Sequence, residues 1–294
     1  MKATSAAISP SEPAPPQAPR DAFAPLARAQ GELRLAFRRR GPDTVLDTLY
    51  QQGCAKARLP NAGPDGWKSA VAINTAGGLT GGDSLAVSVD WRDGARALVA
   101  GQAAEKIYRA ASDVARVRTR LSVGAGAWAE YLPQETILFD AAALDRDTVV
   151  GLMPDSNFLG LESVVLGRQA MGESVRQGRL RDAWRVFRGG RLVYADAISA
   201  EGDIAARFAR AAIGGGARAF ATIVAAAPDI EALLAPVRQA LAEGAHESEA
   251  GASCWDGLLV VRILAADGQR LQRLLPLALA PLRQGRALPR VWRC

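Results

Sequence analysis

The sequence is poor in the side chains that usually hold a metal. It has one histidine, His246, and three widely separated cysteines, Cys54, Cys254 and Cys294. Preformed zinc and nickel sites usually draw on several His or Cys side chains, so a tight metal site within this chain is not expected. His246 lies in the polar stretch AEGAHESEAGAS, without a G-x-S-x-G motif, and reads as a solvated loop residue rather than a member of a Ser-His-Asp triad.

The three cysteines form no C-x-x-C pair, and we expect no disulfide framework. Their scarcity favours a reducing, cytoplasmic compartment. No apolar run approaches the ~20 residues that span a bilayer, and the first twenty residues contain no continuous apolar segment typical of a signal peptide. We expect a disordered Pro-rich tail over residues 1–29 and a single β-rich domain over residues 30–294.

Aromatic residues make up only 6% of the chain, although its net charge of +6 invites a nucleic-acid interpretation. No RNA-binding motif is present. In ARVRTRLSV, residues 115–123, the arginines alternate with Val117, Thr119 and Leu121, which is typical of a half-buried strand with a solvated face. The charge therefore favours docking to an acidic protein surface, and a basic nucleic-acid-binding β-rich protein is the alternative function.

Short alternating runs separated by Gly, Pro or Asp extend from about residue 30 to 200 and predict an antiparallel β-rich body. RVFRGGRLVYAD predicts a hairpin that turns at Gly189-Gly190. GAWAEYLPQETILFD predicts a strand broken by Pro133, followed by a short apolar run over residues 137–139.

Helical patterns begin after residue 200. Asp203 is a candidate cap for a helix over residues 204–213, and Asp229 for one over residues 230–244 with a kink at Pro236. Residues 268–285 have leucines at helical spacing, but Pro276 and Pro281 weaken that prediction. The segments ARAFATIVAAA and GLLVVRILAADG read as strands. The fold class is therefore mainly β, a β-rich α+β fold with two or three helices in the C-terminal third.

A glycine-rich segment, NTAGGLTGGDS over residues 74–84, has nearly the spacing of a phosphate-binding P-loop. Asp83 occupies the position where the motif requires lysine, and a carboxylate repels phosphate. The following residues, LAVSVDW, alternate as a strand and do not begin a helix. The segment therefore joins two strands and is not expected to bind a nucleotide.

Three further segments combine charges with apolar neighbours: GQAAEKIYR, LPQETILFD and LESVVLGRQAMGE. Their carboxylates suit either general acid–base chemistry or hard oxygen ligation of a cation, and each could equally sit at a strand end or in a surface ion pair. An enzyme interpretation would pair Glu135 with Asp140, as in a glycosidase, but no aromatic sugar platforms accompany them.

The four segments together, in this order and at these separations, closely resemble the urease accessory protein family UreD, also called UreH. The resemblance covers about residues 30–200 and continues more weakly to ALPRVW near the C-terminus. The sequence departs from the family pattern at FDAAA, at the end of the third segment, where FDGA is expected. The missing glycine concerns the backbone conformation at Ala141 or Ala142.

The resemblance implies a maturation chaperone and not an enzyme. Such proteins bind apo-urease and the accessory protein UreF, which recruits the GTPase UreG, and the assembly delivers nickel to the urease active site. The family fold it implies is β-rich, with strands stacked in a helical or layered array and a pair of helices.

The resemblance also implies a passage through which nickel reaches urease. Mobile oxygen ligands suit such a passage, because imidazole or thiolate coordination would retain an ion that has to move on. No tightly bound cofactor is expected, only transient Ni²⁺. The candidates for lining the passage are Thr80, Asp83, Glu105, Gln134, Glu135, Asp140, Glu162 and Glu173. The candidates for holding those acids by ion pairing are Lys106, Arg109 and Arg168.

The last thirty residues are rich in arginine and carry one acid, Asp267. With the leucine-bearing helices, this segment is a candidate for partner docking, and the leucines could equally close the core. Arg273 and Arg283 are the charges we expect to contact a partner.

Overall fold

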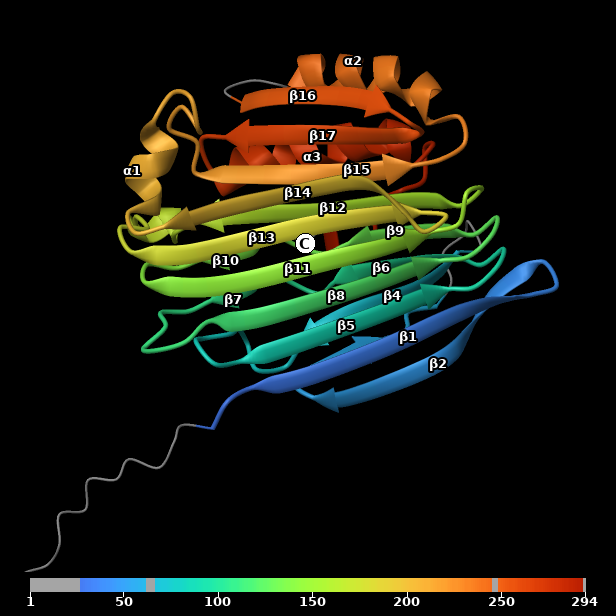
Figure 1. The fold of residues 1–294 in the computed structure, drawn as a ribbon, viewed down its shortest axis with the longest axis horizontal. Helices are drawn as coiled ribbons and strands as arrows, with labels where there is room; N and C mark the ends of the chain where they lie inside the picture. Colours follow the sequence, from blue (N-terminus) through green and yellow to red (C-terminus); the bar gives the residue numbers. More distant parts are fainter. Residues whose placement is uncertain (1–26, 62–66, 245–247, 293–294) are drawn as a thin grey trace, which may run out of the picture.

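The computed structural model describes residues 27–61, 67–244 and 248–292. Most of the expected tail, together with His246 and Cys294, lies outside these residues. Within them the chain forms two large β-sheets packed face to face, with helices at the C-terminal end of the chain (Figure 1).

Sheet A has seven strands. In spatial order they are β14 (Arg191–Glu201), β13 (Gly178–Arg188), β11 (Ala142–Leu152), β8 (Ala115–Val123), β5 (Ser84–Trp91), β1 (Gln30–Arg40) and β2 (Asp43–Gly53). The expected hairpin is confirmed, since β13 and β14 pair antiparallel about the turn at Gly189-Gly190.

Sheet B has ten strands. Eight of them follow the order β16 (Ser248–Trp255), β17 (Leu258–Ala265), β15 (Ala219–Ala226), β12 (Asn157–Leu166), β9 (Trp128–Leu132), β6 (Arg96–Gly101), β4 (Lys68–Asn74) and β3 (Ala55–Arg58). Two short strands lie beside this path: β10 (Thr136–Leu138) pairs with β12 and with β7 (Glu105–Ile107).

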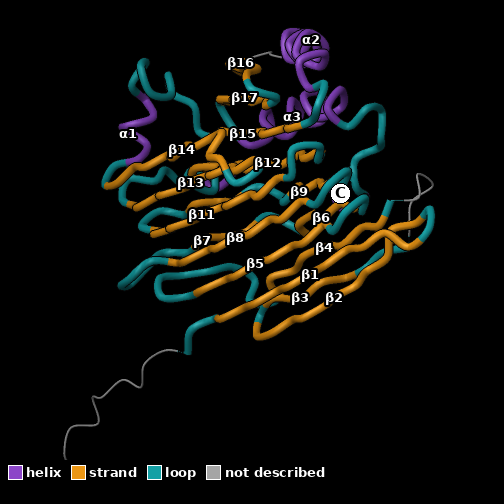
Figure 2. Tube along the Cα trace, turned by 45° about the vertical axis from the view of Figure 1, so that its right-hand side comes forward, coloured by secondary structure: helices purple, strands orange, loops and turns teal. Residues whose placement is uncertain are grey.

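Between β4 and β13 the chain alternates between the sheets, one strand in each per turn of a coil (Figure 2). Successive turns stack in register, so the neighbours within each sheet run parallel, as β5 and β8 do. Parallel neighbours need a crossover, and here a strand of the other sheet provides it. Antiparallel pairing is confined to the ends, at β1–β2, β3–β4, β13–β14 and the strip β12–β15–β17–β16. The mainly β class with stacked, helically arranged strands is confirmed.

Three α-helices occur in the described part of the chain: α1 (Ile204–Ala209), α2 (Leu234–Gly244) and α3 (Gly268–Leu282). Short 3-10 turns cover Gln169–Met171, Ile230–Leu233 and Arg290–Trp292. Asp203 caps α1 as expected, accepting a hydrogen bond from Ala206 N, but the helix ends four residues earlier than predicted. The Asp229 side chain makes no cap bond, and residues 230–244 divide into a 3-10 turn and α2, with Pro236 in the first turn of α2.

Helix α3 is continuous through both prolines. Its N-cap is Asp267, whose side chain accepts from Arg270 N, and its buried face packs Leu271, Leu274 and four further apolar residues against sheet B. This apolar burial outweighs the backbone bonds that Pro276 and Pro281 remove. None of the described helices is long and apolar enough to cross a membrane.

The apolar core has three clusters. One packs sheet B against α2 and α3, and the other two lie between the sheets, around Trp91 at one end and around Leu144 at the other. Strand β16 was not expected from the sequence. It is an edge strand whose side chains are mostly exposed, so it lacks the apolar alternation of an inner strand.

The departure at FDAAA coincides with a left-handed backbone position. Ala141 has φ of 60°, and its N–H donates to Gln177 O while its carbonyl accepts from Ala110 N. The turn between β10 and β11 therefore needs the conformation that glycine adopts without strain, although this chain has alanine there.

Ala141→Gly is expected to stabilise the protein by about 0.5 kcal/mol, because relief of the left-handed strain exceeds the added entropy of the unfolded chain. Urea unfolding monitored by circular dichroism measures the difference. The matched control is Ala142→Gly at the next position, a fully buried strand residue without positive φ, which should cost about 1 kcal/mol. Destabilisation by both changes would contradict the strain.

Candidate functional site

The four sequence segments lie side by side in the fold, although the first ends at residue 84 and the last begins at residue 161. The glycine-rich connection touches β7, since Leu79 N donates to Lys106 O and Tyr108 N to Leu79 O. Strand β7 pairs with β10, and β10 pairs with β12 and binds Gly167 N through Leu138 O. One hydrogen-bonded strip therefore connects all four.

The glycine-rich connection joins β4 of sheet B to β5 of sheet A, as expected for a link between strands. The Asp83 carboxylate accepts from Thr80 N at 2.7 Å and from Ala29 N at 2.8 Å, so it binds amides of the chain itself. Gly78 has φ of 149°, and a Cβ there would lie 2.3 Å from the Tyr108 ring. The glycines thus permit close packing on β7.

Between the sheets, a layer of polar side chains separates the two apolar clusters. On β11, Leu144 belongs to one cluster and Val150 to the other, and the inward positions between them hold Arg146 and Thr148. The inward side chains follow the same order, apolar, polar and then apolar again, on strands β8, β12, β13, β14, β15 and β17. The polar layer consists of Thr119, Arg146, Thr148, Glu162, Asp182, Asp196, Thr222 and Arg262.

Arg146 is the centre of this layer. Its guanidinium binds Asp182 through two hydrogen bonds of 3.0 and 2.6 Å, reaches Glu162 on the other sheet at 2.6 Å, and donates to Thr136 Oγ1 at 2.7 Å. All three charged side chains are at least 93% buried. Burial of this kind demands paired charges, and the cluster supplies two carboxylates for one cation.

The two carboxylates of the cluster bind Arg146 differently. Asp182 takes the bidentate position on Arg146, and Glu162 pairs with Arg146 through one oxygen, Oε1, at 2.6 Å. Burial raises the pKa of Glu162 well above its usual value, against the lowering effect of Arg146, and the nearby Asp182 charge raises it further. Burial also raises the pKa of Tyr131, on the neighbouring strand β9, to about 12.

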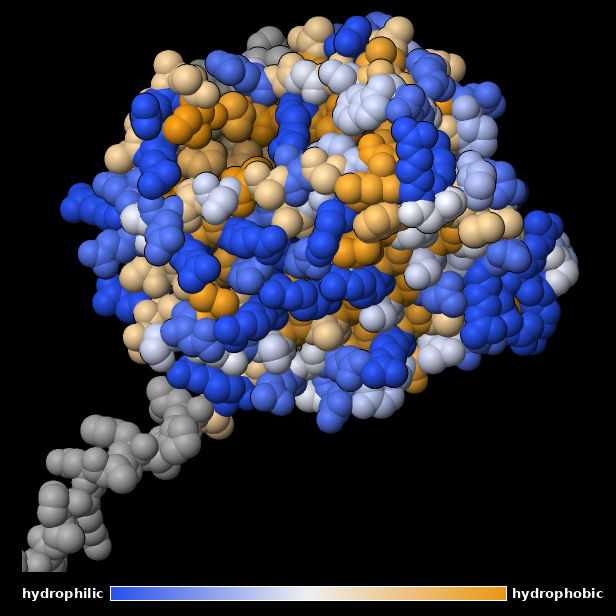
Figure 3. All heavy atoms as spheres, viewed as in Figure 1, coloured by the Kyte–Doolittle hydropathy of each residue, from blue (hydrophilic) through white to orange (hydrophobic). Residues whose placement is uncertain are grey.

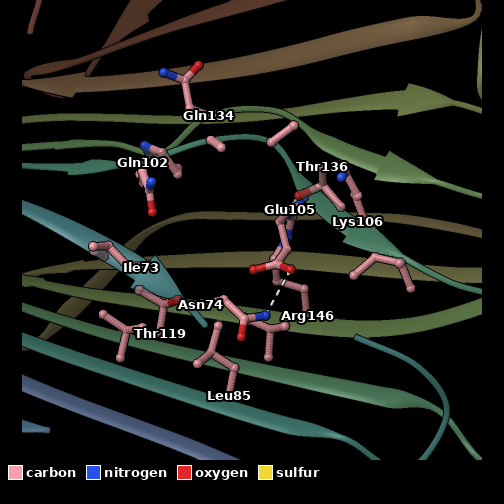
Figure 4. A pocket seen from close by; sticks show the side chains of 18 of the residues that line it. Ile73, Asn74, Leu85, Gln102, Glu105, Lys106, Thr119, Gln134, Thr136 and Arg146 are labelled. Atoms are coloured by element: carbon pink, nitrogen blue, oxygen red, sulfur yellow. Dashed lines mark hydrogen bonds between the residues drawn. The ribbon is translucent and has the colours of Figure 1, made fainter. Parts of the chain in front are cut away.

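A cavity of about 300 Å³ adjoins the Arg146 cluster. Figure 4 shows Glu105 from β7 and Asn74 from the end of β4 pointing toward one another, and Asn74 Nδ2 donates to Glu105 Oε1 at 3.1 Å. Burial raises the pKa of Glu105, with the Asn74 bond acting in the opposite direction. The polar residues lining the cavity are Asn74, Gln102, Glu105, Lys106, Thr119, Tyr131, Gln134, Thr136, Arg146 and Glu162.

The cavity has a second pocket beside it, towards the C-terminal helix. This outer pocket, about 290 Å³, shares Gln102 and Gln134 with the cavity, and Glu135 and Trp292 also line it. Glu135 accepts a hydrogen bond from Gln272 of α3 at 3.0 Å. Four of the predicted passage residues, Glu105, Gln134, Glu135 and Glu162, therefore lie along two adjoining spaces.

The other predicted passage residues lie elsewhere and contact the chain itself. Thr80 Oγ1 donates to Arg109 O at 2.7 Å, Asp83 binds the two amides described above, and Asp140 accepts from Arg176 N and Gln177 N. Glu173 binds the side chain and the backbone N–H of Arg168, and this hydrogen bonding lowers the Glu173 pKa.

Of the predicted supporting cations, Arg168 makes the expected ion pair, at 3.0 Å from Glu173, and its guanidinium lies 4.6 Å from the Phe139 ring centroid. Lys106 lines the cavity, and Arg109 lines a surface pocket with Asp140 and Glu173. Both side chains are exposed, and among the described residues neither has a carboxylate within ion-pair distance.

Of the two predicted docking arginines, only Arg273 is exposed. Arg283 is 3% exposed and pairs with the fully buried Glu130 at 2.9 Å. The prediction that the Arg283 charge contacts a partner is therefore wrong. The same Glu130 binds Arg286, whose guanidinium lies over the rings of Trp67 and Trp128 at 4.1 and 4.3 Å. These contacts fix the C-terminal segment to sheet B.

The sequence interpretation missed Arg146, Asp182 and Asn74. In LDRDTVVGL, strand alternation places Arg146 in phase with Leu144 and Val150, and an arginine on an apolar face was the available signal. Among residues 27–61, 67–244 and 248–292, no three His, Cys, Asp or Glu side chains form a metal-binding group.

A model of the family described as UreD urease accessory protein matches residues 29–293 of this sequence. The chain belongs to the UreD family. A urease accessory protein UreD from Rhizobium leguminosarum bv. viciae is 50% identical over 265 residues, covering 90% of this chain and 95% of that protein. One from Sinorhizobium medicae is 47% identical, covering 90% and 96%.

The UreD match includes both sheets, the cavity and the C-terminal segment, and it begins after the Pro-rich start of the sequence. It confirms the resemblance that the four segments carry. A family of accessory proteins agrees with the prediction that the chain is not itself an enzyme.

Glu162→Gln is expected to change the dependence of stability on pH. A carboxyl whose pKa is raised by folding stabilises the protein most below its unfolded pKa, and that contribution is lost as pH rises towards the folded pKa. The melting temperature of Glu162→Gln relative to the unmodified protein should therefore increase by at least about 2 °C between about pH 5 and about pH 8.

Scanning calorimetry at a series of pH values measures this difference. Glu201→Gln is the matched control, since Glu201 is exposed on β14, and its difference from the unmodified protein should stay constant. If the melting-temperature difference between Glu162→Gln and the unmodified protein stays flat or falls with pH, folding does not raise the Glu162 pKa.

Proposed function

We propose that this chain is a urease maturation chaperone that conducts nickel through the space between its two sheets. The proposal rests on one observation: two carboxylates, Glu105 and Glu162, line a cavity between the sheets together with neutral amide and hydroxyl groups, apolar side chains and the two cations Lys106 and Arg146. The family supports the maturation role.

The donor set suits an ion in transit. Carboxylate, amide and hydroxyl oxygens bind Ni²⁺ less tightly than imidazole or thiolate, so the ion can exchange between them. An ion also has to leave each site as readily as it enters, which requires several weak sites in place of one strong site. The cavity offers several such donors around one space.

The route we propose begins at the outer pocket with Glu135, passes Gln134, which lines both spaces, and reaches Glu105 and Glu162 in the cavity. The carboxylates lower the cost of bringing a divalent cation out of water. Arg146 would repel the cation if it stood alone, but the bidentate ion pair with Asp182 compensates its charge.

Nickel delivery requires partners at both ends of such a route. We propose apo-urease as the recipient and UreF, with UreG bound through it, as the source. Arg273 on the exposed side of α3 is the remaining arginine of the predicted docking pair.

Glu105→Gln is expected to leave the complex with apo-urease intact and to reduce nickel incorporation several-fold, because the amide keeps the size and the Asn74 contact but removes the charge. Nickel in the isolated urease is measured by mass spectrometry after assembly with UreF and UreG, and complex formation by gel filtration. Glu201→Gln, exposed on β14, is the control and should load nickel normally. Normal loading in both Glu105→Gln and Glu162→Gln would refute the route.

A further inference from the structure

Among the residues that the structure describes, no helix lies on the outer face of sheet A (Figure 1). Helices α2 and α3 both pack on sheet B, so one broad face of the sandwich is uncovered in the described part of the chain (Figures 1 and 2). Figure 3 shows this face, where hydrophilic side chains gather over β8, β11 and β13.

Two aspartates of β11 each lie between two arginines from the flanking strands. Asp145 binds Arg118 of β8 at 3.2 Å and Arg181 of β13 at 3.1 Å. Asp147 binds Arg120 of β8 at 3.0 Å and Arg185 of β13 at 2.6 Å. A row of aspartates thus runs between two rows of arginines across three neighbouring strands.

The arrangement recurs at the other end of the sheet. Asp47 on β2 lies between Arg38 of β1 and Arg92, each at 2.8 Å. In all three groups the aspartate is the more buried partner, and each arginine side chain is 37–52% exposed. The Asp145 and Asp147 groups therefore each leave one positive charge in excess at the surface, whereas in the Asp47 group Arg92 also pairs with Asp90 at 3.7 Å.

This geometry prepares the arginines to bind carboxylates. A guanidinium has five N–H donors in a planar fork, and the ion pairs with aspartate use only part of them. The aspartates hold the guanidinium groups in place, which reduces the conformational entropy lost when a partner binds. A partner carboxylate that reaches an exposed arginine can make charge-assisted, paired hydrogen bonds.

Nucleic acid fits the face less well. Binding to a phosphate backbone depends on uncompensated charge and the release of counterions, and here each aspartate already neutralises one of its two arginines. The aspartate row also repels a continuous line of phosphates. A protein surface can instead present separate carboxylates, each placed over an arginine.

We propose that the outer face of sheet A over β8, β11 and β13 docks an acidic protein surface of the urease maturation assembly. Arg120 and Arg185, which share Asp147, form the centre of the contact. The inference rests on the proposed function only for the choice of partners to test, since the face lies on the opposite side of sheet A from the cavity.

The test is the double variant Arg120→Glu/Arg185→Glu, measured by biolayer interferometry against immobilised apo-urease and, separately, UreF. We expect at least tenfold weaker binding to one of them, and a binding constant in the unmodified protein that weakens with salt. Arg120→Gln/Arg185→Gln should give a smaller loss in the same direction, and circular dichroism establishes that each variant is folded. Arg207→Glu, exposed on α1, is the matched control and should bind normally.

Unchanged binding of both partners by the charge-reversed protein would overturn the proposal. So would salt-sensitive binding of a DNA duplex of about 20 base pairs that the double variant loses while protein binding persists. A loss of docking in the double variant together with normal nickel incorporation by both Glu105→Gln and Glu162→Gln would support this face and reject the nickel route.

Discussion

The Arg146 charge is the constraint on which the interior depends. An arginine between two sheets is stable only if carboxylates and hydroxyls satisfy it, and removing one partner of a buried ion pair typically costs about 3–5 kcal/mol. Arg146 meets this requirement by binding Asp182 on its own sheet and Glu162 on the other. The same contacts connect sheet A to sheet B, divide the apolar core between the sheets into two clusters, and leave a polar wall for the cavity.

The coiled path of the chain determines which side chains can contact the Arg146 guanidinium. Because each turn contributes one strand to each sheet, the inward positions of successive turns stack, and Asn74, Glu105, Arg146 and Glu162 converge from four separate stretches of sequence. The two faces of sheet A then have different chemistry. Its inner face uses one buried arginine to organise a cavity, whereas its outer face holds rows of exposed arginines in fixed positions with aspartates. A UreD-family chain thus separates an interior suited to a cation from a surface suited to carboxylates.

Local pattern predicted much of the fold. The hairpin at Gly189-Gly190, the break at Pro133, the strand-to-strand glycine connection and the cap at Asp203 all follow from rules that act over a few residues. Pairing direction did not follow, since alternation is the same in parallel and antiparallel strands. Edge strand β16 has too few buried side chains to show the pattern, and α3 is helical through two prolines because its leucines pack on sheet B.

The sequence alone determined most of the secondary structure, the family, and the position, Ala141 or Ala142, at which alanine replaces the expected glycine, because each depends on local backbone preference or on motifs read in order. Only the tertiary structure decided which charges lie inside. The Asp83 carboxylate accepts hydrogen bonds from backbone amides, and Arg283 is buried in an ion pair with Glu130. Arg146 lies at the centre of the polar layer between the sheets. Whether a charge can be buried depends on the partners that other turns of the coil bring to it, and no local stretch of sequence contains that information.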